Sequence, residues 1–315
     1  MLFFNTTIDG LQLGLCFAVL ALGLYISYSI LDFPDLSVDG TFPLGGVVGT
    51  IFMYRMGINP VIAIIMSFIV GMLAGFITGF LHVKCKMSKL LAGIIVMTGL
   101  LSVTLALTSL LTANKEPTVI FGYIQKNQEL KTIFNPEHKE IYHILILIVI
   151  VLIAKIIIDL FLKTKLGYMI KATGNNETLV ISLGKDAGIY KMAGISIANG
   201  FVAASGAIYA QYTLSYDNTC GSGKVVLALA SVIIGMAIFS NIKFIKDTTA
   251  VIFGAVIYSL CLNYIVLVDT NGIYTKLLNA VLFALILIFN NKISSFFSRK
   301  SKYKSSKKYE TGEVR

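Results

Sequence analysis

Long runs of apolar residues, separated by short polar breaks, dominate this chain. A helix needs about 20 predominantly apolar residues to cross the roughly 30 Å hydrocarbon core of a bilayer, and windows of this length recur throughout the chain. Apolar residues make up 56% of the 315 positions and charged residues only 13%, a balance outside the range of soluble globular domains. The sequence therefore predicts an integral membrane protein.

The apolar windows predict nine crossings within one transmembrane domain, residues 1–291. Helices satisfy their own backbone hydrogen bonds in lipid, and no alternating-strand pattern is visible, so we expect an all-α polytopic fold. Residues 1–54 contain no Lys or Arg, which argues against a cleavable signal peptide. The predicted spans are 8–31, 42–57, 60–82, 89–112, 142–162, 190–212, 224–240, 248–268 and 273–291.

The basic residues predict an orientation in the membrane. They concentrate after the third, fifth and seventh spans and in a basic tail, residues 292–315. The positive-inside bias then places the N-terminus outside and the C-terminus in the cytoplasm. The tail holds most of the net charge of +10, and attraction to anionic lipid explains it without nucleic acid. The basic connections contain Lys84, Lys86, Lys89, Lys163, Lys165, Lys171, Lys185, Lys191, Lys243 and Lys246.

The first unusual break is residues 31–46, which interrupt two apolar spans with three Asp, two Pro and three Gly residues. Such a run cannot form an unbroken helix, so we expect a broken or re-entrant segment that lines protein or a watery cavity. Carboxylates inside a membrane are costly and are functional by default. The alternative is a cytoplasmic turn whose Asp side chains cap helices. The candidate substrate-path residues here are Asp32, Phe33, Asp35, Asp39 and Phe42.

A second break, residues 215–223, lies on a connection that the predicted topology places on the opposite side. Both breaks follow a long span rich in small residues and Tyr, and both precede a short Gly-containing span. Paired breaks of opposite polarity predict an inverted pseudo-repeat with the substrate path at its interface. Tyr209, Gln211 and Tyr212 complete the candidate path. This aromatic set suits an aromatic or zwitterionic solute, although aromatic residues are also common in helices without any such role.

No motif in this chain predicts ATP hydrolysis, metal binding or catalysis. Gly221 to Lys224 ends like a phosphate-binding loop, but Asn218 stands where that loop needs Gly and Val225 where it needs Ser or Thr. The four Cys and three His residues lack disulfide or zinc spacing. We therefore expect no cofactor in this chain, and any ATP must be hydrolysed by another polypeptide. A membrane-embedded enzyme would also need a catalytic signature that is missing.

Residues 164–191 predict a cytoplasmic segment with one short amphipathic helix. Thr173 and Glu177 suit its start, and Gly184 and Gly188 suit its end. Its apolar stripe needs a covering surface, either a cytoplasmic protein or the lipid interface. Elsewhere, Gly71, Gly75 and Gly79 recur every fourth residue and predict close helix packing, and Asn199, Asn263 and Asn279 are expected to bond between helices.

Five segments together resemble permeases of the bacterial ABC-importer superfamily that serves branched-chain amino acids and ribose. The resemblance is strongest to the branch associated with tryptophan-like and other amino-acid substrates, and it covers most of residues 10–290. The segments are LDFPDLSVDGTFPLGG (31–46), LAGIIVMTG (91–99), KATGNNETLVISLGKDAG (171–188), IANGFVAASGAIYAQY (197–212) and ASVIIG (230–235).

The resemblance implies a permease homodimer or pseudo-dimer, two cytoplasmic ATPase subunits and an extracellular or periplasmic solute-binding protein. It also implies that residues 171–188 are the coupling helix that docks into the ATPase, with Lys171, Gly174, Asn175, Asn176, Gly184 and Gly188 as coupling residues. Relatives usually carry Arg at the position of Lys171. The main alternative is an ion-coupled secondary transporter, which would also use inverted repeats and embedded carboxylates but no ATPase.

Overall fold

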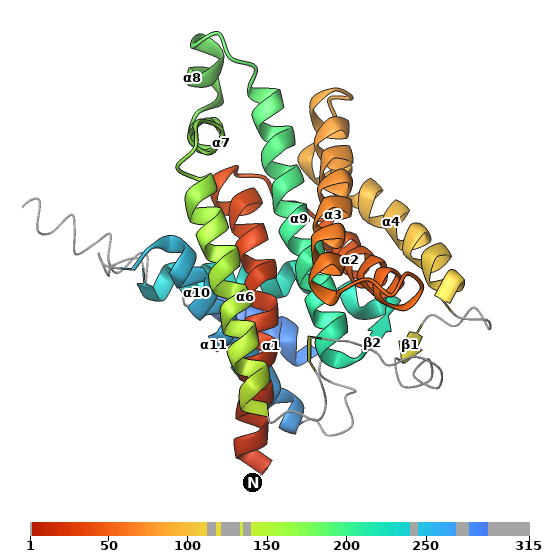
Figure 1. Cartoon of the computed structure of the whole chain (residues 1–315). Helices are drawn as coiled ribbons and strands as arrows, with labels where there is room; N and C mark the ends of the chain where they lie inside the picture. The colour runs from red at the N-terminus through yellow and green to blue at the C-terminus, as the bar shows by residue number, and fades with distance from the viewer. Residues whose placement is uncertain are drawn as a thin grey trace, which may run out of the picture.

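The computed structural model describes residues 2–111, 118–120, 133–134, 140–239, 245–268 and 277–288. These residues form helices, apart from one two-stranded ribbon, so the predicted all-α membrane fold is confirmed (Figure 1). In chain order the elements are α1 (Leu2–Leu24), the π-helix η1 (Tyr25–Ile30), α2 (Val38–Tyr54), α3 (Pro60–Val83), α4 (Lys89–Leu111), β1 (Thr118–Ile120), α6 (Glu140–Phe161), α7 (Lys165–Asn175), α8 (Glu177–Ser182), α9 (Ala187–Thr213), β2 (Ser215–Asp217), the 3₁₀-helix η2 (Asn218–Gly221), α10 (Lys224–Phe239) and α11 (Asp247–Val268).

Seven helices among the described residues are long and apolar enough to cross a membrane. They coincide with predicted spans to within a few residues, except at the N-terminus, where α1 begins earlier than expected. The second predicted span is the 17-residue α2, which is shorter than these helices, and the ninth is described only over Leu277–Ile288. The predicted number of nine is therefore not confirmed. The basic tail, 292–315, lies outside the described residues.

Helix α9 is the centre of the bundle and packs against α1, α2 and α3. Most of its residues are buried, and most of the buried residues are Gly, Ala or Ser, which lets neighbouring backbones approach closely. A Cβ added at Gly71, Gly75 or Gly79 of α3 would lie 2.4–2.9 Å from atoms of α9. The prediction that this glycine row serves helix packing is confirmed.

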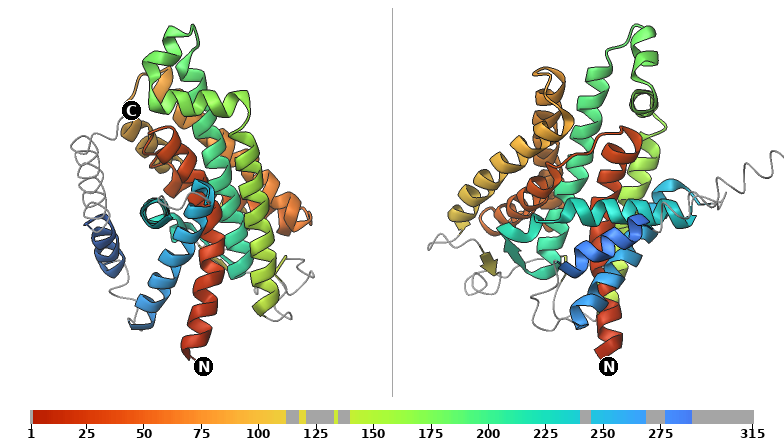
Figure 2. Two further views of the ribbon diagram at one scale, coloured as in Figure 1. Left: turned by 90° about the vertical axis from the view of Figure 1, so that its left-hand side faces the viewer. Right: turned by 180° about the vertical axis from the view of Figure 1, so that it is seen from behind.

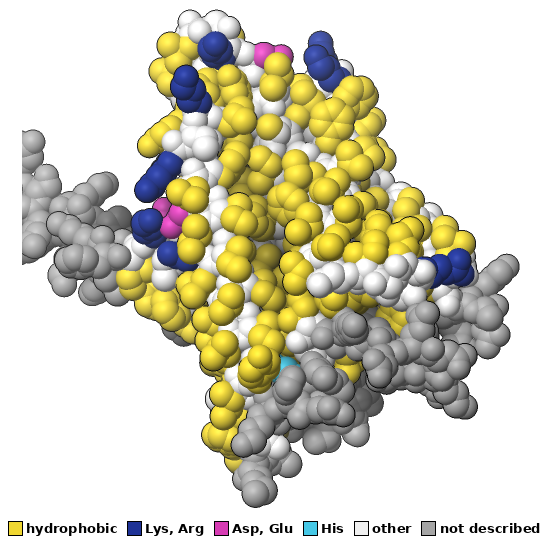
Figure 3. Space-filling model, viewed as in Figure 1, with side chains coloured by type: hydrophobic (Ala, Val, Ile, Leu, Met, Phe, Trp, Pro, Cys, Tyr) yellow, Lys and Arg dark blue, Asp and Glu magenta, His cyan; other side chains and the backbone are white. Residues whose placement is uncertain are grey.

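The outer helices surround this centre. Helices α1, α10 and α11 pack together, and α6 lies along α1. Figure 2 shows that α10 lies across the bundle at a steep angle to α1. Hydrophobic side chains cover most of the flank in Figure 3, and many of its Lys and Arg side chains lie toward the end that carries α7 and α8. An apolar flank of this kind is what contact with lipid requires.

Both sequence breaks begin at a residue in the left-handed backbone region. Asp32 follows η1 with φ 51°, and Leu214 follows α9 with φ 50°. A non-Gly residue rarely adopts this conformation, so both breaks are specified turns rather than frayed helix ends. Helix α2 begins at Val38, earlier than predicted, and Pro43 therefore lies inside its first turns. The inverted repeat itself stays a prediction.

The second break also pairs with the connection after α4. Strand β1 runs antiparallel to β2, with Val119 opposite Tyr216 in the register. Tyr216 is among the largest fully buried side chains of the described chain. The ribbon therefore anchors the second break on the side of the molecule opposite α7 and α8 (Figure 1).

Candidate functional site

The two breaks meet in the middle of the molecule through direct backbone contact. A Cβ added at Gly221 would lie 2.0 Å from the carbonyl oxygen of Asp39, and one at Gly206 would lie 2.0 Å from that of Phe42. A Cβ added at Gly45 would likewise lie 2.0 Å from the carbonyl oxygen of Ala203. Only Gly permits such approaches. We call this meeting of α2, α9, η2 and α10 the central junction.

Asp39 holds the start of α10 within the central junction. Its Oδ1 accepts a hydrogen bond from the amide of Val225 at 2.8 Å, and its Oδ2 accepts one from the amide of Gly223 at 3.1 Å. A carboxylate at a helix N-terminus satisfies free amides and complements the helix dipole. Asp39 is thus a cap, as the alternative reading of the first break expected, but it caps a helix of the second break.

Lys224 lies beside this cap, with its ammonium group against three aromatic rings. Its Nζ is 4.0 Å from the ring centroid of Phe17, 5.1 Å from that of Tyr209 and 5.3 Å from that of Phe42. The rings also contact one another, since Tyr209 lies 5.6 Å from both Phe17 and Phe42. Each cation–π contact contributes about 0.5–2 kcal/mol, depending on desolvation. We call Phe17, Phe42 and Tyr209 the aromatic cage.

Asp35 forms a separate buried network that ties the first break to α9. Its Oδ1 accepts from the Ser37 amide at 2.8 Å and the Ser37 hydroxyl at 2.6 Å, and its Oδ2 accepts from Asn199 Nδ2 at 2.6 Å. The carboxyl is 1% exposed. Burial raises its pKa, while these hydrogen bonds act in the opposite direction. Asn199 thus bonds outside its own helix, but its partner Asp35 lies in the loop before α2 rather than in a helix.

Asp32 and Phe33 lie near the end of the molecule that carries α7 and α8. Asp32 is exposed, and its side chain lies 3.5 Å from the ammonium of Lys89. Phe33 is buried, with its ring edge-on to His82 at 5.2 Å. Neither residue contributes to the aromatic cage.

Gln211 and Tyr212 face different neighbours of α9. Gln211 is fully buried and donates from Nε2 to the carbonyl of Pro60 at 3.2 Å, whereas the Tyr212 hydroxyl donates to Gln12 of α1 at 2.6 Å. Of the eight candidate path residues, the fold therefore brings Asp39, Phe42 and Tyr209 together and places the other five elsewhere.

The sequence reasoning missed Phe17, Lys224 and Ser37. Phe17 lies inside an unbroken apolar helix and carries no local signal. Lys224 carries a local signal, because it is a lone cation at the start of an apolar span. The sequence reasoning used it only to reject a phosphate-binding loop. Ser37 lies two residues from Asp35 and was identifiable as a local hydrogen-bond donor.

The predicted cytoplasmic segment, residues 164–191, contains two short helices before α9 rather than one, which corrects the prediction. Helix α7 ends at Asn175, and α8 begins at Glu177 because the Asn176 side chain accepts from the amide of Leu179 at 3.1 Å. Asn176 is thus an N-cap. Lys171 and Asn175 are exposed on α7. Gly184 has φ 71° directly after α8, and Gly188 lies in the first turn of α9.

Gly174 connects this segment to the first break. A Cβ added there would lie 1.8 Å from the carbonyl oxygen of Ile30 and 2.9 Å from Leu31 Cα. Helix α7 therefore rests on the backbone at the end of η1, immediately before the turn at Asp32. A movement of α7 would act directly on the segment that leads into α2 and the central junction.

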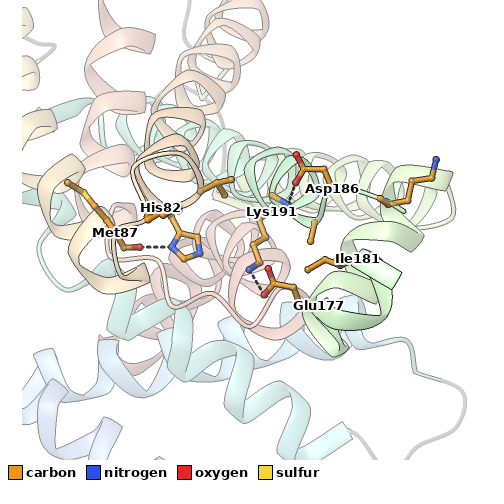
Figure 4. Close-up of a pocket in the computed structure, with 11 residues that line it drawn as sticks. His82, Met87, Glu177, Ile181, Asp186 and Lys191 are labelled. Atoms are coloured by element: carbon orange, nitrogen blue, oxygen red, sulfur yellow. Dashed lines mark hydrogen bonds and ion pairs between the residues drawn. The ribbon is translucent and has the colours of Figure 1, made fainter. Parts of the chain in front are cut away.

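A hollow of about 530 Å³ lies between α8, the start of α9 and the α3–α4 turn. Figure 4 shows Glu177 and Lys191 paired across it, with their charged atoms 2.7 Å apart. On its other side, His82 Nδ1 lies 2.8 Å from the carbonyl oxygen of Met87. The hollow also brings together Lys86 and Lys185, from two of the basic connections.

Helix α8 presents apolar side chains on its outer face. Leu179 is 51% exposed, Ile181 57% and the adjoining Leu183 63%, whereas Val180 is buried. Of the predicted stripe, only Val180 packs inside the chain. We call Leu179, Ile181 and Leu183 the exposed face of α8. Within the described residues, no group of three or more His, Cys, Asp or Glu is arranged to hold a metal ion.

Comparisons with known proteins define the class to which this all-helical membrane chain belongs. Residues 6–303 match the family model described as branched-chain amino acid transport system / permease component. The chain is 39% identical over 278 residues to the tyrosine transport system permease protein of Clostridioides difficile, covering 88% of this chain and 89% of that protein. It is 33% identical over 288 residues to an uncharacterized protein of Rickettsia prowazekii, covering 89% and 96%. No solved structure matches significantly.

The chain therefore belongs to the permease components of branched-chain amino acid transport systems. It is a membrane-spanning subunit of an amino-acid transport system.

Proposed function

We propose that this permease belongs to an ATP-driven importer and carries a small, preferably aromatic, amino acid across the bacterial plasma membrane. Separate ATPase subunits supply the energy, bind the ATP and Mg, and dock on the exposed face of α8. An extracellular or periplasmic solute-binding protein delivers the solute, and two copies of the permease form the complete translocation path.

The observation that carries the proposal is the placement of α7 and α8. The exposed face of α8 has no covering surface within the described chain, while Gly174 of α7 rests on the carbonyl of Ile30 at the start of the first break. An ATPase that moves α8 would thereby displace the backbone leading to Asp39 and Phe42. Rigid elements with close contacts of this kind transmit such movements.

The proposed orientation places α7, α8 and the C-terminus of the chain in the cytoplasm, with the N-terminus of the chain outside. Basic connections that lie far apart in sequence support it, because Lys86, Lys185 and Lys191 line one hollow. The positive-inside bias favours the cytoplasm for that end.

The proposed solute class has two supports. The relative from Clostridioides difficile is named a tyrosine transport system permease, and the aromatic cage with Lys224 and Asp39 offers ring faces beside groups of both charges. A zwitterionic aromatic amino acid matches both features.

The test is uptake of radiolabelled L-tyrosine into proteoliposomes that contain the permease, its co-purified ATPase and the solute-binding protein. We expect uptake with ATP and Mg and none with a non-hydrolysable ATP analogue. Uptake by the permease alone, driven by a sodium or proton gradient, would overturn the proposal in favour of a secondary transporter.

A further inference from the structure

The ammonium group of Lys224 is held by aromatic rings rather than by a carboxylate. Its nearest acidic neighbour, Asp39, already accepts hydrogen bonds from the amides of Gly223 and Val225. Among the ion pairs of the described residues, none within 4.0 Å involves Lys224. The cation therefore rests on the faces of Phe17, Phe42 and Tyr209, with Asp39 acting as a neighbouring charge rather than as an ion-pair partner.

Another cation can readily replace the ammonium group of Lys224 in this arrangement. A Lys side chain has a flexible four-carbon stem, so its ammonium can leave the cage while the backbone of α10 stays in place. Asp39 keeps both amide bonds when this happens, and the start of α10 remains capped. The cage walls come from α1, α2 and α9. Close glycine contacts hold α2 against α9 at Gly45 and Gly206, and α1 against α9 at Gly23.

We propose that the aromatic cage is the site for the ammonium group of the transported amino acid and that Lys224 occupies it in the absence of solute. When the solute enters, its ammonium replaces that of Lys224 against the rings, and the released Lys224 pairs with the solute's carboxylate. No bond is broken and no proton moves. This inference rests on the proposed function and specifies the solute as an α-amino acid zwitterion.

Charge balance explains the selectivity that such an exchange would have. A zwitterion brings one cation for the cage and one anion for Lys224, so the net charge of the junction is unchanged. An amine without a carboxylate would leave two ammonium groups side by side, which is unfavourable. An acid without an ammonium would leave the cage empty if Lys224 moved to meet it.

The chain contains no Trp, so Phe17→Trp creates a fluorophore that reports only on the cage. The purified permease would be titrated with L-tyrosine, with tyramine, which lacks the carboxylate, and with 3-(4-hydroxyphenyl)propionate, which lacks the ammonium. Selective excitation of Trp separates the signal from the added phenols. Phe76→Trp is the matched control, because Phe76 is 48% exposed on α3 and lies outside the cage.

We expect a saturable change in Phe17→Trp emission with L-tyrosine and none with Phe76→Trp. Adding Lys224→Met should weaken L-tyrosine binding about tenfold, the scale of one charge-assisted hydrogen bond, and should strengthen tyramine binding because the cage is then vacant. Equal affinities with and without Lys224, or no emission change from the cage, would overturn the inference. If the Phe17→Trp variant does not fold, Tyr209→Trp places the fluorophore in another wall of the aromatic cage and reports on the same binding. Intact ATP-driven uptake by the unmodified protein, together with an unresponsive cage, would overturn this inference and leave the proposed function standing.

Discussion

The central junction and the α7–α8 segment differ in how far their packing and hydrogen-bonding groups find partners within this chain. At the junction, glycines bring backbones into contact and Asp39 meets the free amides of α10. On α8, by contrast, Ile181 and Leu183 are more than half exposed. The contacts of the central junction are all made within one chain. The α7–α8 segment, in contrast, has an exposed apolar face that needs a partner. Substitutions at the junction should therefore affect folding, and those on α8 should affect function.

The largest expected effect is loss of folded protein in Gly206→Val. The new side chain would meet the carbonyl of Phe42, since even a Cβ would lie 2.0 Å from that oxygen. Overpacking costs about 1–3 kcal/mol where neighbours can move, and here the neighbour is backbone. Size-exclusion chromatography and the melting temperature check this result. Gly99→Val is the control, because no described atom lies within 4 Å of a Cβ there. A monodisperse Gly206→Val protein with normal melting would contradict the close junction.

The next effect is loss of transport without loss of folding in Ile181→Glu. Ile181 is 57% exposed, so the charge costs little in the isolated permease but disrupts an apolar docking face. Removing one interface hot spot costs about 2 kcal/mol or more, or roughly 30-fold in affinity. ATPase co-purification and uptake are the measurements. The buried Val180 provides the contrast, because Val180→Glu should also lower the melting temperature. Full ATPase retention by Ile181→Glu would exclude this face as the docking site.

Asn199→Ala should destabilise the fold by about 1–3 kcal/mol, because it removes a donor from the buried carboxylate of Asp35. The melting temperature of the purified permease measures the loss. Asn263→Ala is the matched control, since Asn263 donates to the carbonyl of Ser259 in its own helix within the described chain, which corrects its predicted interhelical role. Equal melting temperatures for the two variants would mean that the Asp35 network contributes nothing to the stability of the fold.

The smallest effect on stability is expected for Asp39→Asn. Asn caps helices about as well as Asp, so the melting temperature should change little, by roughly 0.5 kcal/mol or less. We still expect a several-fold fall in uptake, because the charge beside Lys224 is lost. Asp32→Asn is the control and should transport normally, since Asp32 is exposed away from the cage. Normal uptake by Asp39→Asn would reduce Asp39 to a cap.

The sequence predicts the helices well because their apolar windows have the length that lipid demands. The spans that became α3, α4, α6 and α11 agree with prediction to within two residues. The glycine row of α3 was also predictable, since a spacing of four places small residues on one helix face.

The site was only partly predictable because its members come from four separate helices. The first break points to Asp39 and Phe42 as candidate site residues. No local pattern links them to Phe17, which lies twenty-two or more positions away inside an apolar run. No sequence pattern shows that the Asn176 side chain accepts from the amide of Leu179, so the sequence predicts one short helix where the structure has two. Which residues meet across a bundle depends on helix crossing, which composition does not specify.

The claim that α7 transmits movement to the first break can be tested through Gly174→Ala. Its methyl group would press on the Ile30 carbonyl, at 1.8 Å from the unadjusted Cβ position, while the exposed face of α8 stays unchanged. The decisive measurement is the ratio of solute transported to ATP hydrolysed in proteoliposomes that contain the assembled transporter. We predict continued hydrolysis with a ratio at least about tenfold lower, which corresponds to about 1.4 kcal/mol of lost coupling. An unchanged ratio would contradict the account.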